Sequence, residues 1–140
     1  MTTASPSPPV GFSLRHASDG FQRDGLRPFY EYRDLGIAAA TGGRAMAHVI
    51  RAIPGQHATA PAHRHALKVQ IVYVLKGWAR FWYEGVGEVL LEAGSCVHQP
   101  PGIVHKEVGH SDDLEMLEIT VPAEFATTIA APNGAPPADA

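Results

Sequence analysis

His63 and His65 stand two residues apart in the segment PAHRHALKVQ, residues 61–70. In an extended strand, residues i and i+2 share a face, so both imidazoles can point at one place. A pair of imidazoles joined by ligands from another strand is a common site for a divalent transition metal. Two exposed histidines at a strand end would give the same spacing, so the pair alone leaves both interpretations open.

A second segment, AGSCVHQPPGIVH at 93–105, contains two further histidines. Gly94 allows a tight turn into a strand, and the Pro-Pro-Gly run at 100–102 ends that strand with a sharp bend. His105 then lies on the returning strand. His98 precedes the bend and is a candidate proton shuttle, because a free imidazole titrates near neutrality. A position on the outer face is the alternative for His98.

The rest of the chain consists of short apolar runs separated by glycine and proline, a pattern typical of an all-β chain. These runs must form the strands that position the histidines. One segment, DLGIAAATGG, could form a helical turn that its glycine pair would end. Turns between the later runs are short enough for antiparallel neighbours. We expect strands at 28–33, 45–53, 68–75, 78–84, 87–91, 95–99, 103–108 and 114–121.

The chain of 140 residues is long enough for a single domain with its own core. Both ends are rich in proline, alanine, serine or glycine and lack apolar periodicity. We therefore expect a flexible segment at 1–19, a folded domain at 20–125 and a flexible tail at 126–140.

Several classes of protein are disfavoured by composition. Cys96 is the only cysteine, so no intrachain disulfide can form. The net charge is −3 and no cluster of lysine or arginine is present, so nucleic acid is not an expected partner. The opening MTTASPSPPV does not resemble a signal peptide, and no run of about 18 apolar residues suggests a membrane span. We expect a cytoplasmic protein without a membrane partner.

The predicted strand at 68–75 is apolar on both faces. Gln70, Val72 and Val74 share one face, while Tyr73 and Leu75 belong to the other. A sandwich or barrel explains this pattern if the outer face is covered by the N-terminal segment or by a second subunit. A homodimer is therefore expected.

Taken together, the two histidine segments resemble the paired motifs of the cupin superfamily. The first reads His-x-His, four residues, Gln70, six residues and Gly77. The second reads Gly94, five residues, Pro-x-Gly, two residues and His105. The resemblance implies a double-stranded β-helix, the cupin jelly-roll barrel, as a single domain that holds one metal ion. It implies that His63, His65, Gln70 and His105 occupy the ligand positions.

This chain departs from the usual cupin pattern at three positions. His57 stands where the first motif usually begins with glycine, and Gly109 stands where the second usually ends with asparagine. Gln70 replaces the usual glutamate. Some cupins that linearise unsaturated uronates or cyclise polyketides are similar in using three histidines and a glutamine. The alternative for Gln70 is an amide that hydrogen-bonds a backbone group beside a three-histidine or empty site.

A neutral amide ligand would leave the charge of a divalent ion less compensated than glutamate would. The ion would then be a stronger Lewis acid and less suited to a higher oxidation state. We therefore expect a metal-dependent enzyme of isomerase, lyase or cyclase type acting on a small oxygen-rich metabolite. A metal-dependent dioxygenase and a non-catalytic binding or sensor protein are the alternatives. Three imidazoles and an amide suit Fe, Mn, Co, Ni, Cu or Zn.

Overall fold

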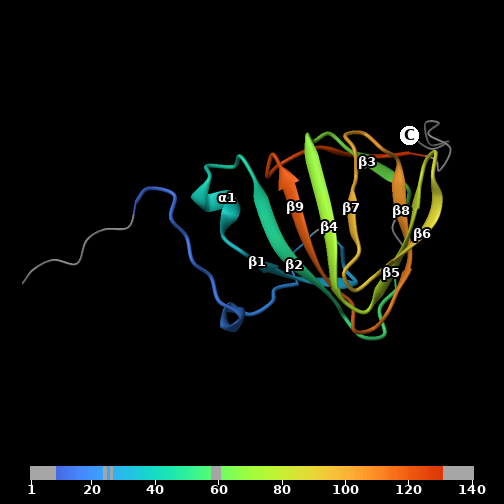
Figure 1. Cartoon of the computed structure of the whole chain (residues 1–140), viewed down its shortest axis with the longest axis horizontal. Coiled ribbons are helices and arrows are strands. Elements are labelled where there is room, and N and C mark those ends of the chain that lie inside the picture. The colour runs from blue at the N-terminus through green and yellow to red at the C-terminus, as the bar shows by residue number, and fades with distance from the viewer. Residues whose placement is uncertain (1–8, 24, 26, 58–60, 131–140) are drawn as a thin grey trace, which may run out of the picture.

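The computed structural model describes residues 9–23, 25, 27–57 and 61–130, and its strands form two facing sheets (Figure 1). The strands are β1 (Tyr30–Asp34), β2 (Met46–Ala52), β3 (His63–His65), β4 (Val69–Lys76), β5 (Trp78–Tyr83), β6 (Gly87–Glu92), β7 (Cys96–His98), β8 (His105–His110), β9 (Glu115–Val121) and β10 (Thr127–Ile129). One sheet has the order β1-β2-β9-β4-β7 and the other β10-β3-β8-β5-β6, with antiparallel neighbours throughout. The predicted jelly-roll barrel is confirmed.

All eight expected strands are present, with ends within two residues of the predicted ones. Strands β3 and β10 were not expected. Strand β3 is three residues long and reads HRH, so it carries no apolar run that would reveal it. Strand β10 lies beyond residue 125, where we expected the domain to end, and it pairs with β3 along its whole length. The sheet therefore continues to Ile129.

The helical elements are short. Helix α1 spans Ile37–Ala40, inside the segment where a helical turn was expected, and a 3-10 turn, η1, spans Ala17–Asp19. Figure 1 shows α1 beside β1 and β2, and residues 9–16, which precede η1, run past α1 outside the barrel. Within the described part of the chain, no helix has the length and apolar character needed to cross a membrane.

The core lies between the two sheets, as the alternation in β4 predicts. Gln70, Val72 and Val74 are buried, whereas Tyr73 and Leu75 on the opposite face are exposed. Leu114, which precedes β9, is fully buried in the same core. The outer face of β4 is thus only partly covered by the described part of this chain, and the homodimer stays a prediction.

Candidate metal centre

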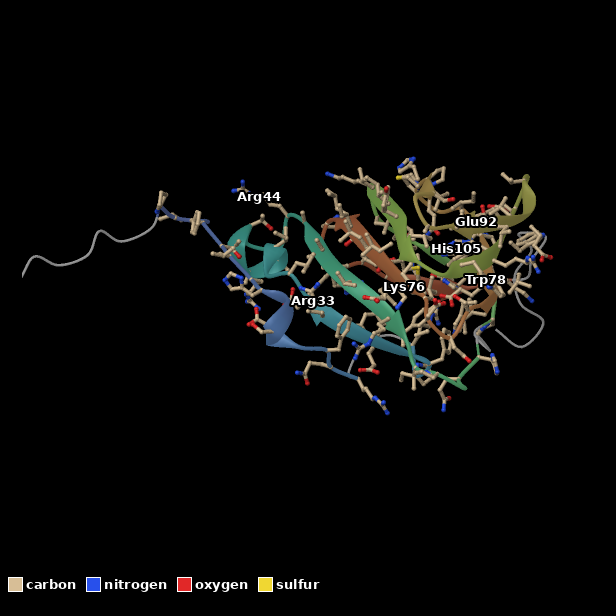
Figure 2. All side chains as sticks on the ribbon, turned by 60° about the horizontal axis from the view of Figure 1, so that its bottom comes forward. Arg33, Arg44, Lys76, Trp78, Glu92 and His105 are labelled. Carbon is tan, nitrogen blue, oxygen red and sulfur yellow. The ribbon has the colours of Figure 1, made fainter. Side chains whose placement is uncertain are left out.

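His63, His65 and His105 lie together in the interior of the barrel. Each has one ring nitrogen within 4.8 Å of the corresponding atoms of the other two, and all three side chains are buried. Strand β3 places His63 and His65 on its inner face, because they are two residues apart. His105 begins β8 directly opposite His63. Figure 2 shows His105 within the barrel, whereas Arg44 projects from the surface.

The bend before β8 brings His105 to this position. Gly102 has a φ of +76°, in the left-handed region that favours glycine, and its N–H donates to the carbonyl oxygen of His65 at 3.1 Å. The turn is thereby attached to the end of β3. The Pro-x-Gly part of the second motif thus has a geometric role next to the three histidines.

The Nδ1 atom of each histidine has a protein partner. The distances are 2.8 Å from His63 to Pro61 O, 3.0 Å from His105 to Ile103 O, and 2.8 Å from His65 to Thr127 Oγ1. A carbonyl oxygen only accepts, so the Nδ1 atoms of His63 and His105 carry the protons. Their Nε2 atoms then carry the lone pairs, which is the usual arrangement of metal-binding histidines.

Burial keeps the three imidazoles neutral. It lowers the pKa of His63 to about 3 and that of His65 to about 4, and it also lowers the pKa of His105. A positive charge on His105 would further disfavour protonation of His63 and His65. Since metals bind the neutral form of histidine, the cluster is ready to act as a ligand set at neutral pH.

Gln70 lines the same cavity from the opposite sheet. Its side chain is buried on the inner face of β4, and Nε2 donates to Glu118 Oε2 at 2.9 Å. The partner is a carboxylate and not the backbone group that we considered from sequence. The other oxygen of Glu118, Oε1, lies 2.7 Å from His48 Nε2. A line of hydrogen-bonded side chains therefore crosses β4, β9 and β2.

Glu118 changes the charge argument made from the sequence. Its burial opposes ionisation, but hydrogen bonds from His48 and Gln70 outweigh burial and hold its pKa below the ordinary value. An ion held by Gln70 would thus have a carboxylate one hydrogen bond away. The sequence predicted that the charge of such an ion is less compensated than with glutamate; the structure adds a carboxylate that would compensate it indirectly, through the amide of Gln70.

A second acid, the half-buried Glu107, lines the cavity two residues after His105. Tyr30 Oη donates to Glu107 Oε2 at 2.6 Å and joins the two sheets. Burial raises the pKa of Glu107 to about 7, against the opposing effect of this hydrogen bond. The cavity, of about 500 Å³, thus contains a carboxyl group suited to proton transfer, which the sequence analysis did not identify.

Arg27 also reaches the histidine cluster. Its Nη2 atom lies 2.9 Å from His63 Nε2. A guanidinium only donates, so Nε2 accepts, in agreement with the proton on Nδ1. A metal ion at His63 Nε2 would replace this hydrogen bond, because the lone pair cannot serve both cations.

His98 is exposed on β7 and is not among the residues that line the cavity. The next residue, Gln99, is buried there instead and accepts a hydrogen bond from Tyr83 Oη at 2.6 Å. We do not assign His98 a role in proton transfer. Cys96 is exposed on the same face of β7, because alternate residues of a strand share a face.

Sequence patterns contain a signal for the acids that were missed. Leu114, Met116 and Glu118 alternate along the strand expected at 114–121, so Glu118 has the inward parity of two buried apolar residues. Glu107 has the parity of His105. A charged residue at an inward position of a predicted strand is a candidate site residue, since buried charges are seldom without function or a partner.

Comparisons with known proteins agree with this architecture. The family model described as the cupin domain matches residues 49–121, more than half of the chain. No curated protein matches the chain in sequence. Among solved structures, KdgF from Halomonas sp. is 21% identical with a TM-score of 0.64, covering 80% of this chain and 96% of that one.

Two other solved structures have the same fold. The polyketide cyclase RemF from Streptomyces resistomycificus is 17% identical with a TM-score of 0.67, covering 85% of each chain. A salicylate 1,2-dioxygenase from Pseudaminobacter salicylatoxidans is 12% identical with a TM-score of 0.58, covering 74% of this chain and 31% of that one. At these identities the likeness shows a common fold.

Proposed function

Because this chain belongs to the cupin family, we propose that it binds one divalent transition-metal ion and acts as an enzyme on a small oxygen-rich metabolite. His63, His65, Gln70 and His105 are the proposed ligands. The observation that carries the proposal is the cluster of three buried histidines, whose candidate ligand atoms lie within 4.8 Å of one another. The three imidazoles are buried and neutral, and each Nδ1 contacts a protein oxygen. These features fit a metal ligand set better than a structural cluster.

The donor set fits Fe, Mn, Co, Ni, Cu or Zn. When bound, such an ion supplies Lewis acidity that polarises a substrate oxygen. Glu107 can take up or return a proton at its carboxyl group, and Tyr30 Oη stabilises the charged form by donating to it. These groups support isomerase, lyase or cyclase chemistry, in which protons move without net oxidation. The shared fold with a polyketide cyclase is consistent with this class.

A dioxygenase is the second candidate, favoured by the shared fold with salicylate 1,2-dioxygenase and by the carboxylate of Glu118 near the proposed site. Negative charge close to an ion makes a higher oxidation state less costly than the sequence alone suggested. Once a substrate is identified from a metabolite screen by thermal shift, turnover without oxygen distinguishes the two. Loss of turnover under anaerobic conditions would assign the dioxygenase.

Metal content tests the proposal directly. Protein purified without chelators should contain about one transition-metal ion per chain. His63→Ala should lose most of it, whereas His98→Ala should retain it, because His98 is an exposed histidine outside the cavity. A wild-type protein without metal that also fails to take up added Co²⁺ or Zn²⁺ would refute the metal site. Bound metal without any turnover would favour a binding or sensor protein.

A further inference from the structure

Glu118 contacts Gln70 from the neighbouring strand. It lies on β9, between β2 and β4, and its two carboxylate oxygens face different neighbours. Oε1 lies 2.7 Å from His48 Nε2, and Oε2 accepts from Gln70 Nε2 at 2.9 Å. The carboxylate is thus held from both adjacent strands. Its side chain is 17% exposed, so its hydrogen bonds are formed largely out of water.

This contact determines which end of the Gln70 amide faces the cavity. Gln70 Nε2 donates to Glu118 Oε2 at 2.9 Å, so the amide nitrogen and not the carbonyl oxygen faces the carboxyl group. The carbonyl oxygen of Gln70 is then the end of the amide left to act as a ligand, in the cavity that Gln70 lines together with the three histidines. Only the oxygen of an amide is a useful metal ligand, since the nitrogen has no available lone pair. The hydrogen bond therefore selects the ligating orientation.

We propose that Glu118 is a positioning residue that turns the Gln70 carbonyl oxygen toward the metal site and supplies, through that amide, the negative charge that the neutral ligands lack. This inference rests on the proposed metal site and adds to it a residue outside the ligand set. It explains why glutamine can stand at position 70: with Glu118 behind it, a glutamate there would place two carboxylates 2.9 Å apart. Two such groups cannot both be ionised without strong repulsion.

Exchange of the two residues is the sharpest test. Glu118→Gln removes the charge and leaves Gln70 free to turn either end toward its partner. Gln70→Glu creates the carboxylate pair. The double variant Gln70→Glu with Glu118→Gln keeps the net charge and the hydrogen bond but reverses the direction of donation. Glu115→Gln is the matched control, because it removes a carboxylate from the outward-facing side of the same strand.

The readout is the Co²⁺ dissociation constant, measured by competition with a chromophoric chelator, together with the visible spectrum of bound Co²⁺. We expect each single variant to bind Co²⁺ about 10-fold or more weakly, in line with losses seen when outer partners of ligands are removed. The double variant should return to within about threefold of wild type with an altered spectrum, because an anionic oxygen replaces the amide. Glu115→Gln should bind as wild type does.

Two results would overturn the inference. One is a Glu118→Gln variant that binds Co²⁺ as tightly as wild type. The other is a folded double variant that is as weak as the singles, which would mean that Glu118 acts only by supporting His48. If the double variant does not fold, the Co²⁺ affinity of Glu118→Gln alone tests the inference. Failure of wild-type protein to bind Co²⁺ at all would instead refute the underlying metal site, so the two failures are distinguishable.

Discussion

Replacing Glu107 with glutamine should stabilise the metal-free fold, and more at alkaline than at acidic pH. The pKa of this carboxyl rises on folding from its ordinary 4.5 to about 7 because the group is buried. A raised folded-state pKa gives stability that is complete below 4.5 and is lost as the pH rises through 7. Glutamine has the same shape, can pair with Tyr30, and does not titrate.

The size of the effect follows from the pKa values. Each pKa unit corresponds to about 1.4 kcal/mol, so ionising Glu107 in the folded state costs about 3 kcal/mol well above pH 7. Partial exposure to the cavity reduces this cost, and we expect Glu107→Gln to raise the free energy of unfolding by about 2 kcal/mol at pH 8. At pH 5 the folded protein keeps Glu107 protonated, and the gain should be below about 1 kcal/mol.

Urea unfolding followed by tryptophan fluorescence measures the effect, on chelator-treated protein at pH 5 and pH 8. Glu92→Gln is the control: Glu92 is exposed on β6, and its replacement should change stability by less than about 0.5 kcal/mol at both pH values. Added metal should shrink the pH dependence, because a nearby cation favours the ionised carboxylate. A Glu107→Gln variant with the same change in stability at both pH values would refute the reasoning.

Two further variants test a hydrogen bond to one proposed ligand and the packing of the core. Thr127→Val should weaken Co²⁺ binding about 10-fold in chelator competition, because it removes the hydroxyl that contacts His65 Nδ1, while Thr128→Val should not. Equal affinities for both variants would exclude that role. Leu114→Ala should lower the free energy of unfolding by about 2–5 kcal/mol, since the side chain is fully buried, whereas Leu90→Ala, 47% exposed, should cost under about 1 kcal/mol. Similar losses in urea unfolding would contradict the assigned burial.

Much of the fold could be predicted because strand periodicity is a local property. The alternation around Val72 and Val74 identifies an inner face without knowledge of any partner strand. The spacing of His63 and His65 likewise fixes a shared direction. Strand β3, which carries both, was missed because its three residues have no apolar run, and its strand character comes from pairing with β8 and β10.

The rest of the site depends on contacts between residues far apart in the chain. Gln70 and Glu118 are 48 residues apart, and Tyr30 and Glu107 are 77 apart. No local pattern specifies which inward residues of different strands meet across a barrel. Parity alone marks Glu118 as inward but does not show that it faces Gln70. The indirect charge compensation therefore required the three-dimensional structure.

The proposed ligands are divided between the two sheets. The three histidines come from β3 and β8 in one sheet, and Gln70 comes from β4 in the other. An ion held by all four would be a cross-link between the halves of the barrel, comparable in connectivity to a disulfide. Separating the sheets at that point would require breaking a coordination bond as well as apolar contacts. Through the ion, Gln70 would then oppose separation of the two sheets, which three histidines on a single sheet could not do.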